Sequence, residues 1–150
     1  MTITSVTAGT ALGSNNSATQ QPTPPAHVAG DLLIGIGRIG STSSGVSADY
    51  ATTLASLNTS NRRMLVVAKI AESDAEPGPI FTYAGGAAGS TTMAVCLKIS
   101  GASADLGSIL DIAAAPADSS GTPTQNIGHA ALTGITTDGC AILFIGGKAD

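Results

Sequence analysis

The chain has 150 residues, of which 11% are charged, with a formal net charge of −4 and only six Lys and Arg residues. The charged share is less than half of the roughly 25% usual in soluble domains, so we expect other subunits to cover much of the surface; a monomer rich in small residues is the alternative. So few basic residues argue against nucleic-acid binding, and no charge-free apolar stretch approaches the roughly 20 residues that cross a bilayer.

Apolar, extended runs alternate along the chain with stretches rich in Gly, Pro, Ser and Asp, the residues that turns select. Strands are predicted at Thr4–Thr7, Asp31–Ile39, Thr53–Leu57, Met64–Ile70, Ile80–Tyr83, Thr92–Ile99, Ile109–Ala113, His129–Gly134 and Cys140–Ile145. Spacing of roughly 10–15 residues without a long helical period favours an all-β fold, an antiparallel sandwich or barrel. The length suits one domain with its own core.

The segment 47–57, SADYATTLASL, leaves a helix open as an alternative to a strand. Asp49 could cap such a helix, and Tyr50, Leu54 and Leu57 fall at helical spacing.

Side-chain alternation divides the predicted strand Asp31–Ile39 into two faces. One face carries Leu32, Ile34 and Ile36. The other mixes large residues with glycine: Leu33, Gly35, Gly37 and Ile39. Glycines on that face leave room for another backbone or a packed side chain.

The same strand contains Gly35, Gly37 and Gly40, the G-x-G-x-x-G spacing of dinucleotide-binding turns. That use needs a helix beginning at the third glycine and an acidic residue about 20 positions later. Here STSSGVSAD follows the third glycine, and the later position reads LNTSNRR, without an acid. We therefore expect an ordinary strand and no nucleotide cofactor.

No residue qualifies as catalytic from the sequence. Ser and Thr are abundant, but no G-x-S-x-G motif occurs, and His27 and His129 lie in Pro-rich and Gly-rich surroundings typical of loops. A triad assembled only in space stays open. We therefore expect no enzymatic activity.

Arg62 and Arg63 are the one adjacent pair of basic residues. We interpret them as an exposed turn or as partners in a salt bridge between subunits.

The candidates for metal binding are weak. Glu72, Asp74 and Glu76 alternate in a loop, a pattern that suits Ca²⁺, but a solvated turn is favoured because the glycine and distal glutamate of a calcium-binding helix-loop-helix are missing. Cys96 and Cys140 each lie in an apolar run, which predicts buried free thiols. A disulfide would require their two strands to lie close together.

Five segments of the chain follow one another in a set order. Pro22–Ala29, a Pro-rich approach, leads into GDLLI at Gly30–Ile34, and ADYATTLAS follows with Tyr50. Next come LVVAKIAESDAEPGPIFTYAGGAAG, which carries Lys69, Ala71, Glu76, Pro77 and Phe81, then MAVCLKISGASADLGSILDIAAA and ALTGITTDGCAILFIGG. This order resembles a family of jelly-roll-like β-sandwich modules of tailed-bacteriophage structural proteins, found in capsid decoration proteins, head fibres and tail fibres. The pattern of that family opens with "aGDLLla" and commonly has a Trp where Tyr50 stands. The resemblance spans most of residues 26–147.

This resemblance implies one two-sheet sandwich domain over residues 1–150. Residues 1–25 are expected to form an extended N-terminal arm, whose first residues, MTITSVTAGT, could augment a neighbour's sheet. Such modules usually continue beyond Gly146–Gly147, so the last strands are expected from another chain or from a longer product. The implied function is that of a virion protein assembled in the host cytoplasm, a capsid decoration or head-fibre subunit. Its implied partners are the major capsid protein or other virion proteins and itself, as a homotrimer. A tail-fibre module that recognises a host glycan is the alternative, and no cofactor, nucleic acid or membrane is implied.

Overall fold

The computed structural model describes residues 3–14, 18–39, 44–59, 62–83, 92–102 and 105–106. Three predicted strands, Ile109–Ala113, His129–Gly134 and Cys140–Ile145, lie outside the described residues. Gly40 also lies outside them.

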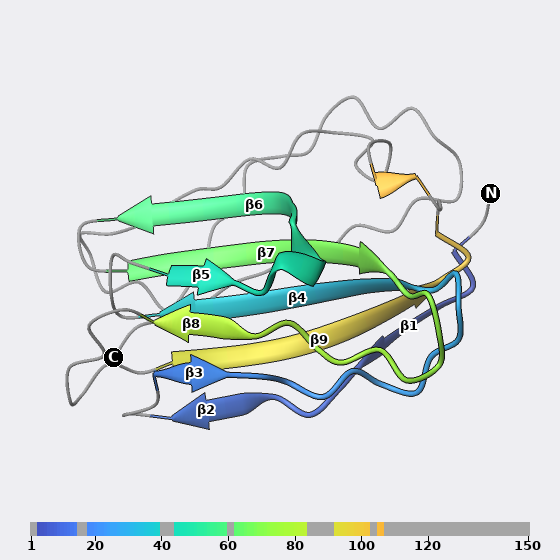
Figure 1. The fold of residues 1–150 in the computed structure, drawn as a ribbon, viewed down its shortest axis with the longest axis horizontal. Helices are drawn as coiled ribbons and strands as arrows, with labels where there is room; N and C mark the ends of the chain where they lie inside the picture. The colour runs from blue at the N-terminus through green and yellow to red at the C-terminus, as the bar shows by residue number, and fades with distance from the viewer. Residues whose placement is uncertain are drawn as a thin grey trace, which may run out of the picture.

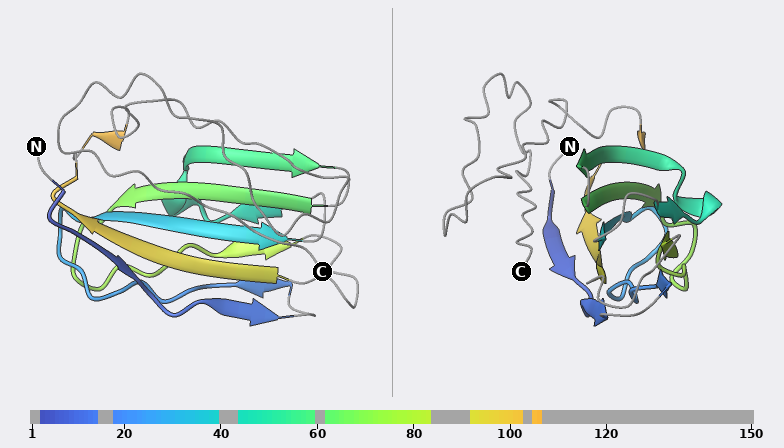
Figure 2. Two further views of the ribbon diagram at one scale, coloured as in Figure 1. Left: turned by 180° about the vertical axis from the view of Figure 1, so that it is seen from behind. Right: turned by 90° about the vertical axis from the view of Figure 1, so that its left-hand side faces the viewer.

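Two antiparallel sheets pack into a sandwich. The smaller sheet faces the viewer in Figure 1, and the larger sheet faces the viewer in the reversed view on the left of Figure 2. The larger sheet runs in the order β1 (Ser5–Ala8), β9 (Thr92–Ser100), β4 (Leu32–Ile39), β7 (Arg62–Ile70) and β6 (Thr52–Thr59), and β2 (Leu12–Ser14) also pairs with β9. The smaller sheet runs in the order β3 (Thr19–Gln20), β8 (Phe81–Tyr83) and β5 (Ser44–Val46). The prediction of an all-β, two-sheet sandwich is confirmed.

The helix alternative for residues 47–57 is wrong. Only a single 3-10 turn forms, Ala48–Tyr50, and β6 follows it, pairing with β7. A bulge between Thr53 and Ala55 lets the strand pair along β7 on both sides of an extra residue. This pairing satisfies the backbone hydrogen bonds of the segment, and it outweighs the helical spacing of the apolar residues.

The N-terminal residues form strands within this chain. Ser5 pairs with Ser100 and Ala8 with Leu97, so β1 lies along β9, while β3 pairs with β8 of the smaller sheet. All four side chains of β1 are exposed. Backbone hydrogen bonds therefore hold this strand more than side-chain packing does.

The main core lies between the two sheets. Its buried members are Leu33, Tyr50, Leu65, Val67, Ala71, Phe81, Ala94 and Cys96. A second buried cluster lies on the opposite face of the larger sheet and contains Leu32, Ile34, Val66, Ala68, Leu97 and Ile99. Since β4 and β7 bury both faces, their sequences are nearly continuous apolar runs instead of alternating ones.

The glycines of β4 make room for the smaller sheet. A Cβ atom added at Gly37 would lie 2.5 Å from Cδ1 of Phe81, and one added at Gly35 would meet Pro79 and lie 3.3 Å from Cζ of Phe81. β4 is a central strand, paired with both β7 and β9. The expectation that Gly35 and Gly37 are packing positions is thus confirmed.

Candidate functional site

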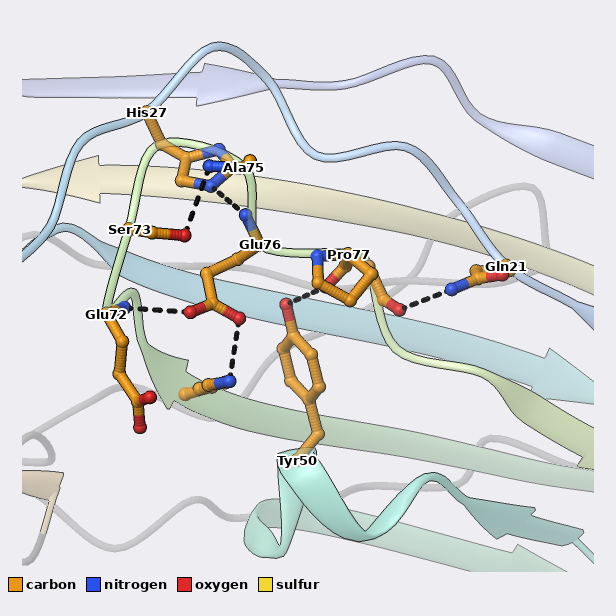
Figure 3. A network of polar contacts seen from close by, with 10 residues as sticks. Gln21, His27, Tyr50, Glu72, Ser73, Ala75, Glu76 and Pro77 are labelled. Atoms are coloured by element: carbon orange, nitrogen blue, oxygen red, sulfur yellow. Dashed lines mark hydrogen bonds and ion pairs between the residues drawn. The ribbon is translucent and has the colours of Figure 1, made fainter.

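The loop of residues 71–80 joins β7 of the larger sheet to β8 of the smaller sheet, and a network of polar contacts holds it (Figure 3). We call it the 71–80 loop. Its first residue continues the sheet, because Ala71 N donates to Asp31 O at 2.8 Å and Gly30 N donates to Ala71 O at 2.8 Å. Its side chains from Glu72 to Ala75 are exposed.

An ion pair anchors the middle of the loop to the end of β7. Nζ of Lys69 lies 2.8 Å from Oε2 of Glu76, and the two side chains are 16% and 11% exposed. Oε1 of Glu76 also accepts from the backbone N of Glu72 at 3.1 Å. The hydrogen bond between the two side chains raises the pKa of Lys69 and lowers the pKa of Glu76, in each case against an opposing effect of burial.

His27 joins the Pro-rich segment to the same loop. Its Nδ1 lies 2.7 Å from Pro25 O, and its Nε2 accepts from the backbone N of Glu76 at 3.2 Å. Both ring nitrogens therefore have partners, and Figure 3 shows the ring beside Glu76. The turn prediction for this region did not anticipate the contact, since His27 and Glu76 lie 49 residues apart.

Two further contacts fix the end of the 71–80 loop. The Tyr50 hydroxyl donates to Pro77 O at 3.1 Å, and Gln21 Nε2 donates to Gly78 O at 3.2 Å. Tyr50 is buried, and burial raises the pKa of its hydroxyl. A phenol in this setting stays protonated and acts as a hydrogen-bond donor to the loop.

The Gly30–Asp31 motif builds the turn that precedes β4. Gly30 has a φ of +92°, a value that L side chains rarely adopt. Asp31 N donates to Val28 O at 3.1 Å, and Oδ2 of Asp31 accepts from Val28 N at 3.0 Å. Burial alone would raise the pKa of Asp31, but its hydrogen bonds with Ser100 and Val28 and the nearby Lys98 and His27 lower it.

The three acidic residues considered for Ca²⁺ do not converge. Glu72 and Asp74 are exposed, whereas Glu76 turns toward Lys69. Among the described residues, no three His, Cys, Asp or Glu side chains are grouped to hold a metal ion. The interpretation of Arg62 and Arg63 as a turn is wrong, because their backbones belong to β7 and pair with Thr59 and Asn58 of β6. His129 and Cys140 lie outside the described part of the chain.

An open cavity of about 440 Å³ lies beside the ion pair. Its lining mixes apolar side chains with two carboxylates and one amine: Asp49, Ala51, Thr52, Ala68, Lys69, Ile70, Glu72 and Leu106. Lys69 is already paired with Glu76. Of the other charged residues described in its lining, Asp49 and Glu72 are exposed.

Cys96 lies at the inner core with 0% exposure, and burial raises the pKa of its thiol to about 11. In a Cys140→Ser background, we expect a thiol reagent to label the folded protein at pH 8 at least roughly a hundredfold more slowly than the urea-unfolded protein, because two pKa units reduce the thiolate about that much. Absorbance of the released chromophore measures both rates. Equal rates would show that Cys96 is accessible.

Comparison of the chain with protein-family models, with curated proteins and with solved structures gave no match. No helix within the described ranges is long and apolar enough to cross a membrane. The assignment of function therefore depends on the residues and their contacts.

Replacing Glu76 by Gln is expected to lower the free energy of unfolding by about 1–3 kcal/mol, because the half-buried Lys69 ammonium loses its charged partner. Urea unfolding at pH 7 measures the change. Glu72→Gln in the same loop is the matched control, and its exposed side chain predicts a change within about 0.5 kcal/mol. Similar losses in both variants would contradict the structural role of the ion pair.

Acid should weaken the folded protein through Asp31 and Glu76. Both have a lowered pKa when folded, so their contribution is complete above the unfolded carboxyl values of about 4 and is lost as pH falls through the lower folded values. Urea midpoints measured from pH 6 to pH 2.5 should decline, and the decline should be shallower in Glu76→Gln. If the urea midpoints of both proteins declined in parallel, Glu76 would be excluded as a source of the pH dependence of stability.

Proposed function

We propose that this chain is a structural protein of a bacteriophage virion, a capsid decoration or head-fibre subunit that works by binding other proteins. Its partners are the major capsid protein or other virion proteins, together with copies of itself in a homotrimer. It assembles in the host cytoplasm and has no catalytic, cofactor, nucleic-acid or membrane role. The jelly-roll-like connection of the strands is part of this proposal.

The observation that carries the proposal is the role of the residues on which the family resemblance rests. Asp31 builds the turn before β4, Lys69 and Glu76 form the ion pair, Pro77 accepts from Tyr50, and Phe81 packs over the glycines of β4. These residues make structural contacts with one another and with the backbone. Such contacts support a protein that acts through its shape and surface and not through a reaction centre.

The composition supports the same function. A chain with 11% charged residues offers little surface charge to keep it dispersed, as expected for a subunit covered by others. In the described part of the chain, β1 also pairs on one side only, at the end of the larger sheet. This edge, which no described strand covers, fits the addition of a strand from a neighbouring protein.

The alternative, a tail-fibre module that binds a host glycan, receives less support. Sugar sites commonly use exposed aromatic rings, and Tyr50 and Phe81 are both 1% exposed. The side chain of Tyr83 and the whole of Phe144 lie outside the description. A glycan array separates the two functions, because only the alternative predicts saturable sugar binding.

The decisive experiment is the native mass of the purified chain, alone and after mixing with capsids that lack it. The proposal predicts a discrete oligomer that binds the shell in a fixed copy number. A monomer that leaves capsids uncoated would overturn it.

Deleting residues 1–8 tests the part played by β1. Thermal unfolding should show a retained fold, since the β1 side chains are exposed and Ile3, the other apolar contact removed, is only partly buried. Capsid binding should be lost. Unchanged binding would rule out β1 as the contact.

A further inference from the structure

The two contacts of His27 specify its protonation. Pro25 O can only accept a hydrogen bond, so Nδ1 at 2.7 Å must carry a proton. The backbone N of Glu76 can only donate, so Nε2 at 3.2 Å must present its lone pair. The contacts together require the neutral ring with its proton on Nδ1.

A second proton on Nε2 is incompatible with this arrangement. It would place an N–H of the ring against the N–H of Glu76, so the hydrogen bond between the Pro-rich segment and the loop would be lost. The contact with Pro25 would remain, because Nδ1 is protonated in both forms. Only the hydrogen bond between Nε2 and the Glu76 amide therefore depends on the protonation state of the ring.

We propose that His27 is a pH-sensitive latch: the neutral ring binds the Glu76 amide of the 71–80 loop, and uptake of a second proton breaks this hydrogen bond. The contacts of the Glu76 carboxylate with Lys69 and with the backbone of Glu72 do not involve the ring, so the change is centred on the Glu76 amide. Histidines take up protons between about pH 8 and pH 5. The latch therefore holds at the upper end of this range and opens toward the lower end.

The charged groups around the ring do not replace the lost bond. Glu76 and Asp31 are the carboxylates on which the charge of His27 acts. The oxygens of Glu76 already accept from Lys69 and Glu72, and Oδ2 of Asp31 accepts from Val28. Glu72 and Asp74 of the loop are exposed, and Lys98 of β9 acts on Asp31.

The first measurement is the ¹⁵N spectrum of the ring in the intact chain, with a His129→Gln variant used to assign the signals. At pH 8 we expect the tautomer protonated at Nδ1. A ring protonated at Nε2 would overturn the proposal, and this result needs no variant of His27.

The second measurement is hydrogen exchange of the Glu76 amide, expressed as a protection factor to remove the intrinsic effect of pH. Loss of one hydrogen bond predicts a fall of roughly tenfold between pH 8 and pH 5. His27→Gln is the matched control, since its amide oxygen can accept from Glu76 N at any pH, and its protection factor should stay constant. An unchanged factor in the wild type, or an equal fall in His27→Gln, would overturn the latch.

Discussion

Replacing Phe81 by alanine is expected to lower the free energy of unfolding by about 3–5 kcal/mol, the cost usual for removing a buried aromatic ring. The ring is 1% exposed and belongs to the core between the sheets. It also comes from a strand of only three residues, Phe81–Tyr83, which has few other means of holding the smaller sheet in place. Removing it should therefore loosen both the core and the attachment of that sheet.

Urea unfolding followed by circular dichroism measures this loss. Thr82→Ala is the matched control, because Thr82 is the exposed neighbour on the same strand, and its effect should stay within about 0.5 kcal/mol. A loss within about 0.5 kcal/mol in Phe81→Ala would contradict the central position of the ring, since that is the range of ordinary surface changes.

Gly37→Ala should cost about 1–3 kcal/mol or more, because a methyl group has no room beneath the Phe81 ring. The added Cβ would lie 2.5, 2.7 and 2.8 Å from three ring atoms. Gly35→Ala should have a comparable effect, since its Cβ would meet Pro79, whose ring cannot turn aside. Thermal and urea unfolding both measure the change.

Gly13→Ala is the control for these variants. Gly13 lies in β2, it is exposed, and the nearest atom to an added Cβ is Thr92 O at 3.9 Å. Its stability should change by no more than about 0.5 kcal/mol.

A double variant tests the contact between Gly37 and Phe81 directly. In a Phe81→Leu background, the loss of stability caused by Gly37→Ala should be smaller, giving a coupling energy of about 0.5–3 kcal/mol. Additive effects would mean that the two positions do not touch.

The sequence predicted the central strand β4 well, including the face on which Gly35 and Gly37 lie. Period-two alternation is a property of the backbone, so it holds wherever the strand pairs. It could not predict β3 or β5, because Thr19–Gln20 and Ser44–Val46 are too short to show any period. The spacing of Tyr50, Leu54 and Leu57 fitted a helix as well as a strand, and only pairing with β7 decides between them.

The polar network was beyond prediction for a different reason. Its main contacts join Lys69 to Glu76 and His27 to Glu76, and the second pair lies far apart in the sequence. The segment AESDAEPGP correctly indicated a turn. Nothing in its composition distinguishes the glutamate that turns inward from the two acidic residues that stay exposed. That distinction depends on where the Pro-rich segment passes, which is a property of the folded chain.

The pairing of β1 with β9 has a consequence for the order in which the chain folds. Ser5 lies opposite Ser100, so the N-terminal strand has no place to pair until nearly the whole described sequence has left the ribosome. β4 and β7 are closer in sequence and can pair earlier, which leaves the backbone groups on the other edge of β4 unpaired until β9 is made. Pairing across such long separations is slow. Chains interrupted before Thr92 would present that uncovered edge to one another, and aggregation is the outcome to expect from them.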